Sequence, residues 1–122
     1  RATSPAGDAS TIPRRVTKLQ ELLAKVEAGE WDCLSEHYPL GYKTYANFGR
    51  AYEDGSLNAA KALHEAVLPE WEWQIGSEDA YLETGDPCNE WTFRTASADN
   101  IDPARAWLIA IIKALIAQEA TT

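Results

Sequence analysis

The sequence lacks several features that would point to a function class at once. It contains no methionine among its 122 residues, so we expect that Arg1 is not the translation start. No run approaches the roughly 18 consecutive apolar residues of a membrane span, because Lys113 interrupts the most apolar stretch, residues 106–117. Basic residues are also few, with 11 Lys and Arg against 19 Asp and Glu and a net charge of -8. This balance argues against nucleic acid, which is bound mainly through cations that neutralise phosphates, and no membrane partner is expected.

The rest of the composition is that of an ordinary globular protein, with 45% hydrophobic and 25% charged residues. A chain of this length buries roughly two thirds of the surface that its unfolded form exposes, so one domain can hold a core without disulfide or metal staples. The two cysteines, Cys33 and Cys88, therefore need no structural role, and whether they pair is left open.

Residues 1–15 are small, polar and punctuated by proline, a composition typical of a flexible arm. The arm is basic on an otherwise acidic chain, because three arginines oppose the single acidic residue Asp8. We predict a flexible arm over residues 1–15 and a single α+β domain over residues 16–122. Arg14 and Arg15 are candidates for docking the arm onto a protein partner, and a solvated tail is the alternative.

Periodicity in the remaining chain predicts the elements of the domain. Apolar residues recur at helical spacing from Val16 to the turn at Gly29, over residues 57–67 and over residues 104–118. The last helix is apolar around most of its circumference, which predicts a central, buried position. Apolar and polar residues alternate in three short segments that predict strands: residues 71–75, 80–83 and 90–95. The expected fold is α+β, with a three-stranded antiparallel meander packed with about three helices.

Three segments resemble the phage ABA-sandwich domain family. SLNAAKALHEAVLPEWEWQIG (residues 56–76) is a small-residue helix that runs into an alternating tryptophan strand, and DPARAWLIAIIKALIA (residues 102–117) is similar to the last helix of that family. LQELLAKVEAG (residues 19–29) fits its opening helix, so the resemblance covers residues 19–117, while residues 30–54 do not match. The resemblance implies a small phage or prophage protein of compact α+β fold, with no established activity to carry over.

The residues that could carry metal or nucleophilic chemistry are few. Cys33 and His37 stand four residues apart, which offers half of a zinc site on one helical turn, with His64 and Cys88 as distant candidates for the rest. The alternative is a buried thiol and a surface imidazole, because structural zinc normally draws on two close pairs of ligands. No signature of a nucleophile, a zinc-protease helix or a phosphate-binding loop is present. We therefore predict no catalytic residue, no metal and no cofactor.

The aromatic residues divide into two groups. One group falls on the apolar phase of its strands or helix and is predicted to lie in the core: Trp71, Trp73, Trp91 and Trp107. The other group lies in residues 30–54, where tyrosines have helical spacing but Gly41 and Gly49 argue against a helix. We predict that this group forms an exposed patch that binds a protein: Trp31, Tyr42, Tyr45 and Tyr52. The alternative is that the segment covers the open face of the sheet.

One stretch carries charge of a single sign. Between Glu65 and Glu90 the chain has eight acidic residues and no Lys or Arg. Five of them are candidate contacts for a basic partner: Glu78, Asp79, Glu83, Asp86 and Glu90. The alternative is a solvated acidic surface that keeps a small sheet from pairing edge to edge.

These features predict a non-catalytic protein that binds another protein. The family resemblance implies that it is phage-encoded and acts in the virion or in the cytoplasm of the infected bacterium. In the leading form it is a virion component, such as a head-decoration or connector-type subunit, whose arm is ordered by a neighbouring subunit. The alternative is an acidic inhibitor of a host or defence protein with a basic groove. A small hydrolase or metal-binding protein is a third alternative, and self-association through the aromatic segment or a sheet edge is left open.

Overall fold

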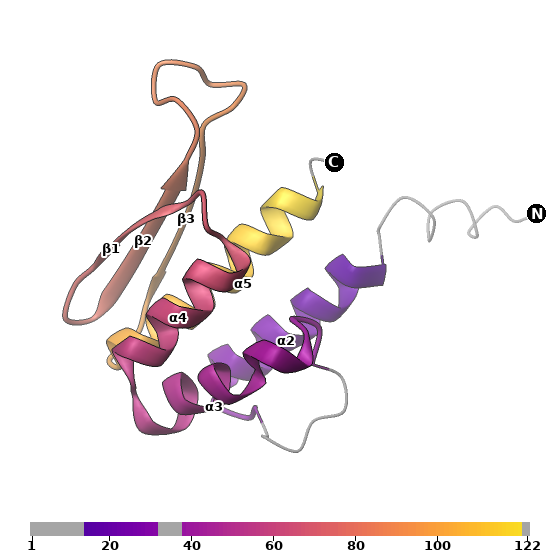
Figure 1. Cartoon of the computed structure of the whole chain (residues 1–122), viewed down its shortest axis with the longest axis vertical. Coiled ribbons are helices and arrows are strands. Elements are labelled where there is room, and N and C mark those ends of the chain that lie inside the picture. The colour runs from indigo at the N-terminus through magenta and orange to yellow at the C-terminus, as the bar shows by residue number, and fades with distance from the viewer. Residues whose placement is uncertain (1–13, 32–37, 121–122) are drawn as a thin grey trace, which may run out of the picture.

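The computed structural model describes residues 14–31 and 38–120, and these ranges form four α-helices and one sheet (Figure 1). The helices are α2 (Arg14–Ala28), α3 (Tyr45–Asp54), α4 (Leu57–Val67) and α5 (Pro103–Ala120), and a 3-10 turn, η1 (Tyr42–Thr44), precedes α3. The strands are β1 (Glu72–Ile75), β2 (Asp79–Thr84) and β3 (Arg94–Asp99), which pair antiparallel in the order β1-β2-β3. The α+β class and the three-stranded meander are confirmed, with one helix more than predicted.

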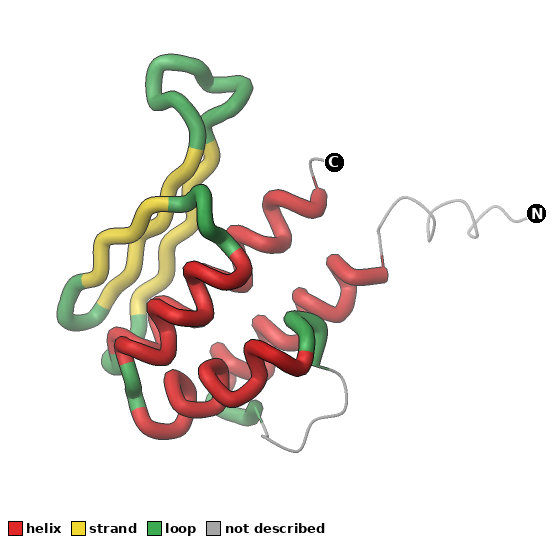
Figure 2. The backbone as a smooth tube through the Cα atoms, in the orientation of Figure 1, coloured by secondary structure: helices red, strands yellow, loops and turns green. Residues whose placement is uncertain are grey.

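The elements form three layers around α5. From left to right, Figures 1 and 2 show the sheet, then α4 and α5, then α2 and α3. α5 contacts β2 and β3 on one side, α2 and α3 on another, and α4 beside it. Its side chains are buried around most of its circumference, and Leu108, Ile111 and Ile112 are fully enclosed. A helix that is apolar on all sides must be covered on all sides, so the predicted central helix is confirmed.

Local signals in the sequence set the helix ends. α3 ends at Gly55, whose φ of 66° is the left-handed conformation that closes many helices. α4 follows at once, because the Ser56 Oγ accepts a hydrogen bond from a backbone N–H of its first turn at 3.1 Å. α5 starts at Pro103, after Asp102, whose Oδ1 accepts from the Ala104 N–H at 3.0 Å.

The sheet has one apolar face and one polar face. The register places Leu82 opposite Ala96 and Ala80 opposite Ala98, and these four side chains are buried on the side that contacts α5. Side chains at the intervening positions point to the other side of the sheet. No described helix covers that second face (Figure 2).

The predicted bounds of the third strand are wrong. The strand was expected at residues 90–95, but β3 begins at Arg94, and residues 85–93 form a loop that projects beyond the sheet (Figure 1). In this projecting loop, the Asp86 carboxylate and the Asn89 amide oxygen each accept a hydrogen bond from the backbone N–H two residues further on, at 2.9 and 3.0 Å. Such turns offer the backbone local partners in place of a neighbouring strand.

Two of the four tryptophans predicted in the core lie partly or wholly outside it. Trp71 and Trp107 are buried, whereas the exposed fraction is 37% for Trp73 and 81% for Trp91. Trp73 belongs to the edge strand β1, so one side of its ring has no neighbouring strand. Trp91 lies in the projecting loop, where the strand periodicity assumed for it does not apply.

The predicted exposed aromatic patch is also wrong. Trp31 and Tyr52 are buried and Tyr45 is half-buried. The Trp31 ring lies 6.0 Å from the Tyr45 ring, 4.8 Å from that of Phe48 and 5.2 Å from that of Tyr52. α3 packs on α4 and α5, so these rings fill the helical layers and leave the polar sheet face uncovered. The side chain of Tyr42 lies outside the described residues.

The two sheet faces can be tested by truncation. Leu82 is fully buried in the central strand, so Leu82→Ala should lower the free energy of unfolding in urea by about 2–5 kcal/mol, through lost apolar contact and a residual cavity. Thr95→Ala, on the exposed face of β3, should lower it by less than about 1 kcal/mol. Equal losses in the two variants would contradict this assignment of the faces.

Candidate functional site

The uncovered face of the sheet collects polar and acidic side chains from all three strands. We refer to the following residues, which share it, as the open face: Glu72, Gln74, Asp79, Tyr81, Glu83, Thr95, Ser97 and Asp99. Tyr81 and Glu83 are half-buried, and the others are exposed. The strand register therefore brings together carboxylates that lie far apart in the sequence.

Four of these carboxylates form two directly opposed pairs. Glu72 of β1 faces Glu83 of β2, and Asp79 of β2 faces Asp99 of β3. Directly opposed residues have Cβ atoms roughly 4.5–5.5 Å apart, a distance at which like charges destabilise an antiparallel sheet. The sheet thus keeps a repulsive arrangement of charge on its uncovered surface.

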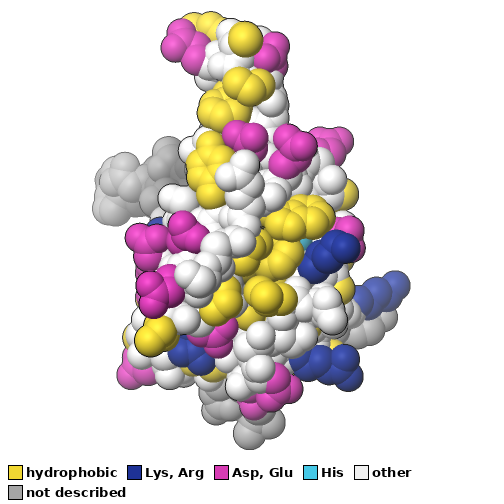
Figure 3. All heavy atoms as spheres, turned by 90° about the vertical axis from the view of Figure 1, so that its left-hand side faces the viewer, with side chains coloured by type: hydrophobic (Ala, Val, Ile, Leu, Met, Phe, Trp, Pro, Cys, Tyr) yellow, Lys and Arg dark blue, Asp and Glu magenta, His cyan; other side chains and the backbone are white. Residues whose placement is uncertain are grey.

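No cation offsets this charge within the described part of the chain, where none of the four carboxylates forms a salt bridge. Arg94, the one basic residue of the strands, belongs to the other face, and its Nη1 donates to the Phe93 carbonyl at 2.9 Å. Lys113 of α5 reaches only the outer edge of β3, where its Nζ donates to the Ser97 carbonyl at 3.1 Å. Figure 3, which views the molecule from the sheet side, shows acidic side chains on either side of an apolar strip and basic side chains beside its lower right.

Tyr81 adds a hydrogen-bond donor among the carboxylates of the open face. Its hydroxyl donates to the Glu83 Oε2 at 3.2 Å. Desolvation raises the pKa of Tyr81, and the hydrogen bond and charge of Glu83 raise it further. The phenol therefore stays protonated at neutral pH and remains a donor.

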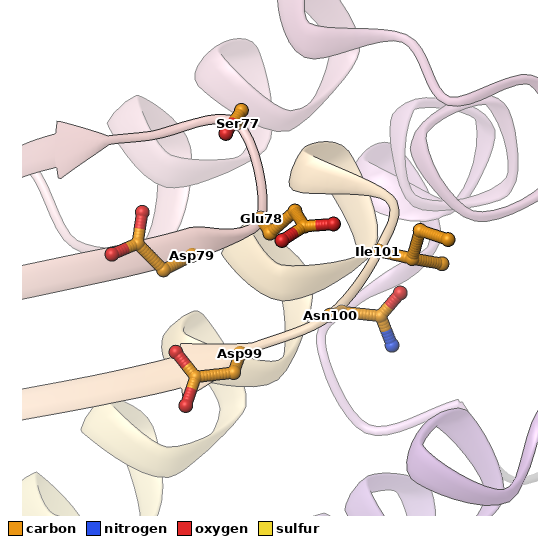
Figure 4. A pocket seen from close by; sticks show the side chains of 6 residues that line it. All are labelled: Ser77, Glu78, Asp79, Asp99, Asn100 and Ile101. Carbon is orange, nitrogen blue, oxygen red and sulfur yellow. The ribbon is translucent and has the colours of Figure 1, made fainter.

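The open face ends in a hollow of about 480 Å³, where the β1–β2 turn meets the end of β3 (Figure 4). The hollow is lined by Ser77, Glu78, Asp79, Asp99, Asn100 and Ile101. The Asn100 N–H donates to the Glu78 carbonyl at 2.8 Å, which joins the two segments. Ile101 is 85% exposed, and Figure 4 shows Glu78 extending toward it, whereas Asp79 and Asp99 point the other way. This end of the face therefore offers apolar and anionic contacts side by side.

The projecting loop lies at the opposite end of the strands (Figure 1). Its backbone folds on itself, since the Asn89 and Phe93 N–H groups donate to the Asp86 and Asn89 carbonyls at 2.8 and 3.0 Å. Gly85 has a φ of 89°, and any side chain there would collide with the Thr92 carbonyl. These contacts give the loop a defined shape and leave Trp91 exposed, as is typical of residues that anchor protein interfaces.

His64 holds the start of β1 in place. Its ring is fully buried, and its Nδ1 lies 3.2 Å from the indole Nε1 of Trp107. Because an indole N–H can only donate, Nδ1 is the acceptor and the ring proton is on Nε2, which donates to the Trp71 carbonyl at 2.8 Å. The Trp73 ring packs on the imidazole with their centroids 5.0 Å apart. The polar network thus ties α4 and α5 to β1.

The acidic residues predicted from the sequence divide among three places. Asp79 and Glu83 lie on the open face, and Glu78 lies in the turn at its end. Asp86 and Glu90 lie in the projecting loop, away from the strands. The structure therefore brings together only part of the predicted set.

Two of the four carboxylates of the open face, Glu72 and Asp99, were not among the predicted site residues. Glu72 was part of the acidic run, and its place in the alternating segment 71–75 is the signal that could have identified it. Asp99 lies outside the acidic run. Only the strand register, which sets it opposite Asp79, places it on the open face.

The predicted docking residues of the arm lie at its junction with α2. Arg14 and Arg15 are the first residues of α2, so the helix begins two residues before the predicted domain boundary. The Arg15 Nε forms an ion pair with the Glu119 Oε1 at 3.0 Å, which engages it within the chain. The side chain of Arg14 and residues 1–13 lie outside the described residues.

The predicted half zinc site also lies outside the described residues, since neither Cys33 nor His37 belongs to them. Cys88 is a free, exposed thiol in the projecting loop, and His64 is engaged in the core. Among the residues that the structure describes, no three His, Cys, Asp or Glu side chains converge as a metal site requires. In residues 14–31 and 38–120, no helix combines the length and apolarity needed to cross a membrane.

Comparison with known proteins assigns no relative. No protein-family model matches the chain, and neither a curated protein nor a solved structure matches it. The resemblance to the phage ABA-sandwich domain family therefore stays a prediction.

The His64 network predicts a dependence of stability on pH. Burial lowers the pKa of His64 in the folded chain, although the hydrogen bond to Trp71 and the charge of Glu65 oppose the shift. The unfolded chain therefore takes up the proton first, so stability is full above the ordinary imidazole pKa of about 6.5 and falls as the pH drops below it. Urea denaturation at several pH values measures this loss. His64→Gln should flatten the curve between about pH 5 and 6.5, and parallel curves would contradict the network.

The opposed carboxylates predict substitutions that stabilise the fold. Glu72→Gln and Asp99→Asn each remove one partner of a repulsive pair, so each should raise the free energy of unfolding by about 0.2–1 kcal/mol at low salt. The gain should shrink in high salt, which screens the repulsion. Glu21→Gln, at an exposed position of α2, is the matched control. An equal gain in the control would show that overall charge, rather than pairing on the sheet, is responsible.

Proposed function

We propose that this chain is a non-catalytic protein-binding protein whose open face binds a basic surface of another protein. The observation that carries the proposal is the pairing of carboxylates on both sides of β2, Glu72 with Glu83 and Asp79 with Asp99. A Lys or Arg side chain between two such carboxylates replaces repulsion with charge-assisted hydrogen bonds. Binding of a basic partner would therefore relieve a cost that the free sheet bears.

The two ends of the open face support the same proposal. The hollow at one end combines Glu78 with the exposed Ile101, and the projecting loop at the other presents Trp91. Interfaces commonly combine a few apolar anchors with complementary charge around them. The net charge of -8 would also speed the encounter with a basic partner.

From the family resemblance, we further propose that the protein is phage-encoded and acts in the cytoplasm of the infected bacterium. An acidic open face favours an inhibitor that occupies the basic groove of a host or defence protein. The virion component stays a prediction, because it depended on the arm, and residues 1–13 lie outside the described residues.

A pull-down with charge-neutral variants tests the proposal. The wild-type chain, immobilised and exposed to bacterial lysate, should retain a basic protein at low salt and release it as salt rises. The open-face variant carries four substitutions and should retain much less of that protein: Glu72→Gln, Asp79→Asn, Glu83→Gln and Asp99→Asn. Quantitative mass spectrometry measures the retained proteins.

A second variant of equal net charge provides the control. It carries four substitutions at exposed positions outside the sheet and should bind like the wild type: Glu21→Gln, Glu27→Gln, Glu30→Gln and Glu53→Gln. Equal loss of binding in both variants would refute a role for the open face, as would a retained protein whose binding is insensitive to salt.

A further inference from the structure

The outer edge of β1 has backbone groups without partners. The Gly76 N–H donates to the Asp79 carbonyl at 3.0 Å, and hydrogen-bonded positions alternate with non-bonded positions along an antiparallel pair. Trp73 and Ile75 are therefore non-bonded positions, and their N–H and C=O groups point away from β2. In the described chain, no hydrogen bond reaches these outward groups.

The opposite edge of the sheet is protected. The Asn100 N–H donates to the Glu78 carbonyl, so the same alternation turns the Ser97 backbone outward on β3. The Nζ of Lys113 occupies that edge, 3.1 Å from the Ser97 carbonyl. A lysine on an edge strand is a common means of preventing strand addition. The sheet therefore has one blocked edge and one free edge.

A hollow of about 250 Å³ lies beside the free edge on the open face. It is lined by Glu72, Trp73, Gln74, Tyr81 and Glu83. The opposed pair of Glu72 and Glu83 makes the hollow anionic, and the planar guanidinium of an arginine can bind two carboxylate oxygens at once. An arginine projecting from a neighbouring strand is thus suited to fill it.

The other side of the free edge combines apolar side chains with one cation. The Trp73 ring packs at a tilt against the Trp107 ring, with centroids 5.6 Å apart, and the Lys61 Nζ lies over the Trp73 ring, 6.0 Å from its centroid. Ile75, the next residue of β1 on the same face as Trp73, is half-buried. An apolar side chain from a neighbouring strand could cover the exposed part of Trp73.

We infer that the free edge of β1 accepts an extended basic segment of the partner protein as a fourth strand. This inference rests on the proposed function and specifies the form of the partner. Basic residues of the segment face the open side, with one arginine in the hollow between Glu72 and Glu83. Apolar residues alternate with them and lie over Trp73 and Ile75. Hydrogen bonds between the backbone of the segment and the edge of β1 would supply affinity, and the alternating side chains would supply specificity.

Charge favours a partner segment over a second copy of this chain. Antiparallel pairing of two β1 strands would bring together two sets of carboxylates, from Glu70 and Glu72 at the start of the strand and Glu78 after its end. Each chain also carries a net charge of -8, which opposes association with itself. A basic strand would instead be attracted to the same carboxylates.

Two capped peptides of equal charge test the inference. One alternates arginine with valine and can form a strand, and the other alternates arginine with proline and has few backbone donors. Calorimetry should show the strand-forming peptide binding about tenfold more tightly, as expected for lost backbone hydrogen bonds. On binding, hydrogen exchange at the Trp73 and Ile75 amides of the wild-type protein should slow, a readout that needs no mutation.

A proline substitution gives a second, independent test. Ile75→Pro removes an outward N–H and leaves the β1–β2 ladder intact, so the variant should fold and bind the strand-forming peptide about tenfold more weakly. Gln74→Pro is the contrasting variant, because Gln74 bonds to β2 and the fold itself should be destabilised. Circular dichroism checks the fold of both.

Each outcome separates this inference from the proposed function. Equal affinity for the two peptides, without slower exchange at Trp73 and Ile75, would overturn strand addition and still support an acidic binding face. Failure of both peptides to bind, while the pull-down depends on the open face, would overturn the inference alone. A wild-type dimer that Ile75→Pro abolishes would show that a second copy occupies the edge, and would also overturn it.

Discussion

The burial of α5 on all sides is the constraint on which the rest of the structure depends. The side chains of this helix are apolar around its circumference, so it must be covered on every side. The sheet covers one side of it, and α2 and α3 cover another. The strands meet α5 through Leu82 and three alanines, which fill one face of the sheet. The described chain has no further layer, so the second face of the sheet meets water. An open face is therefore a consequence of how the core is filled.

The same core positions the edge that we infer to bind a partner. β1 is only four residues long, and a strand of this length needs anchoring. Trp107 of α5 donates to His64 of α4, and His64 donates to the Trp71 carbonyl just before β1. A buried polar network of this kind has one arrangement that satisfies all its members. The location of the β1 edge is thus set by contacts inside the helical layers.

Three cations of the described chain make contacts that do not involve the carboxylates of the open face. Arg105 stacks over the Tyr52 ring at 4.2 Å and donates to the Tyr52 carbonyl at 3.1 Å, within the helical layers. Arg15 pairs with Glu119, and Lys113 blocks the β3 edge. The carboxylates of the open face keep their charge uncompensated as a result. The proposed binding of a basic surface rests on this separation of charge more than on the total acidity of the chain.

The sequence by itself determined the elements whose signals are local. Residues 57–67 form a helix as predicted, because the Ser56 cap, the apolar period and Pro69 all act within a few residues. Tertiary structure decided where β3 lies and which carboxylates meet. The turns at Asp86 and Asn89 displaced the expected strand, and Asp99 faces Asp79 only through a register set by burial against α5. Strand register and aromatic burial depend on contacts between distant segments, and neither composition nor periodicity contains those contacts.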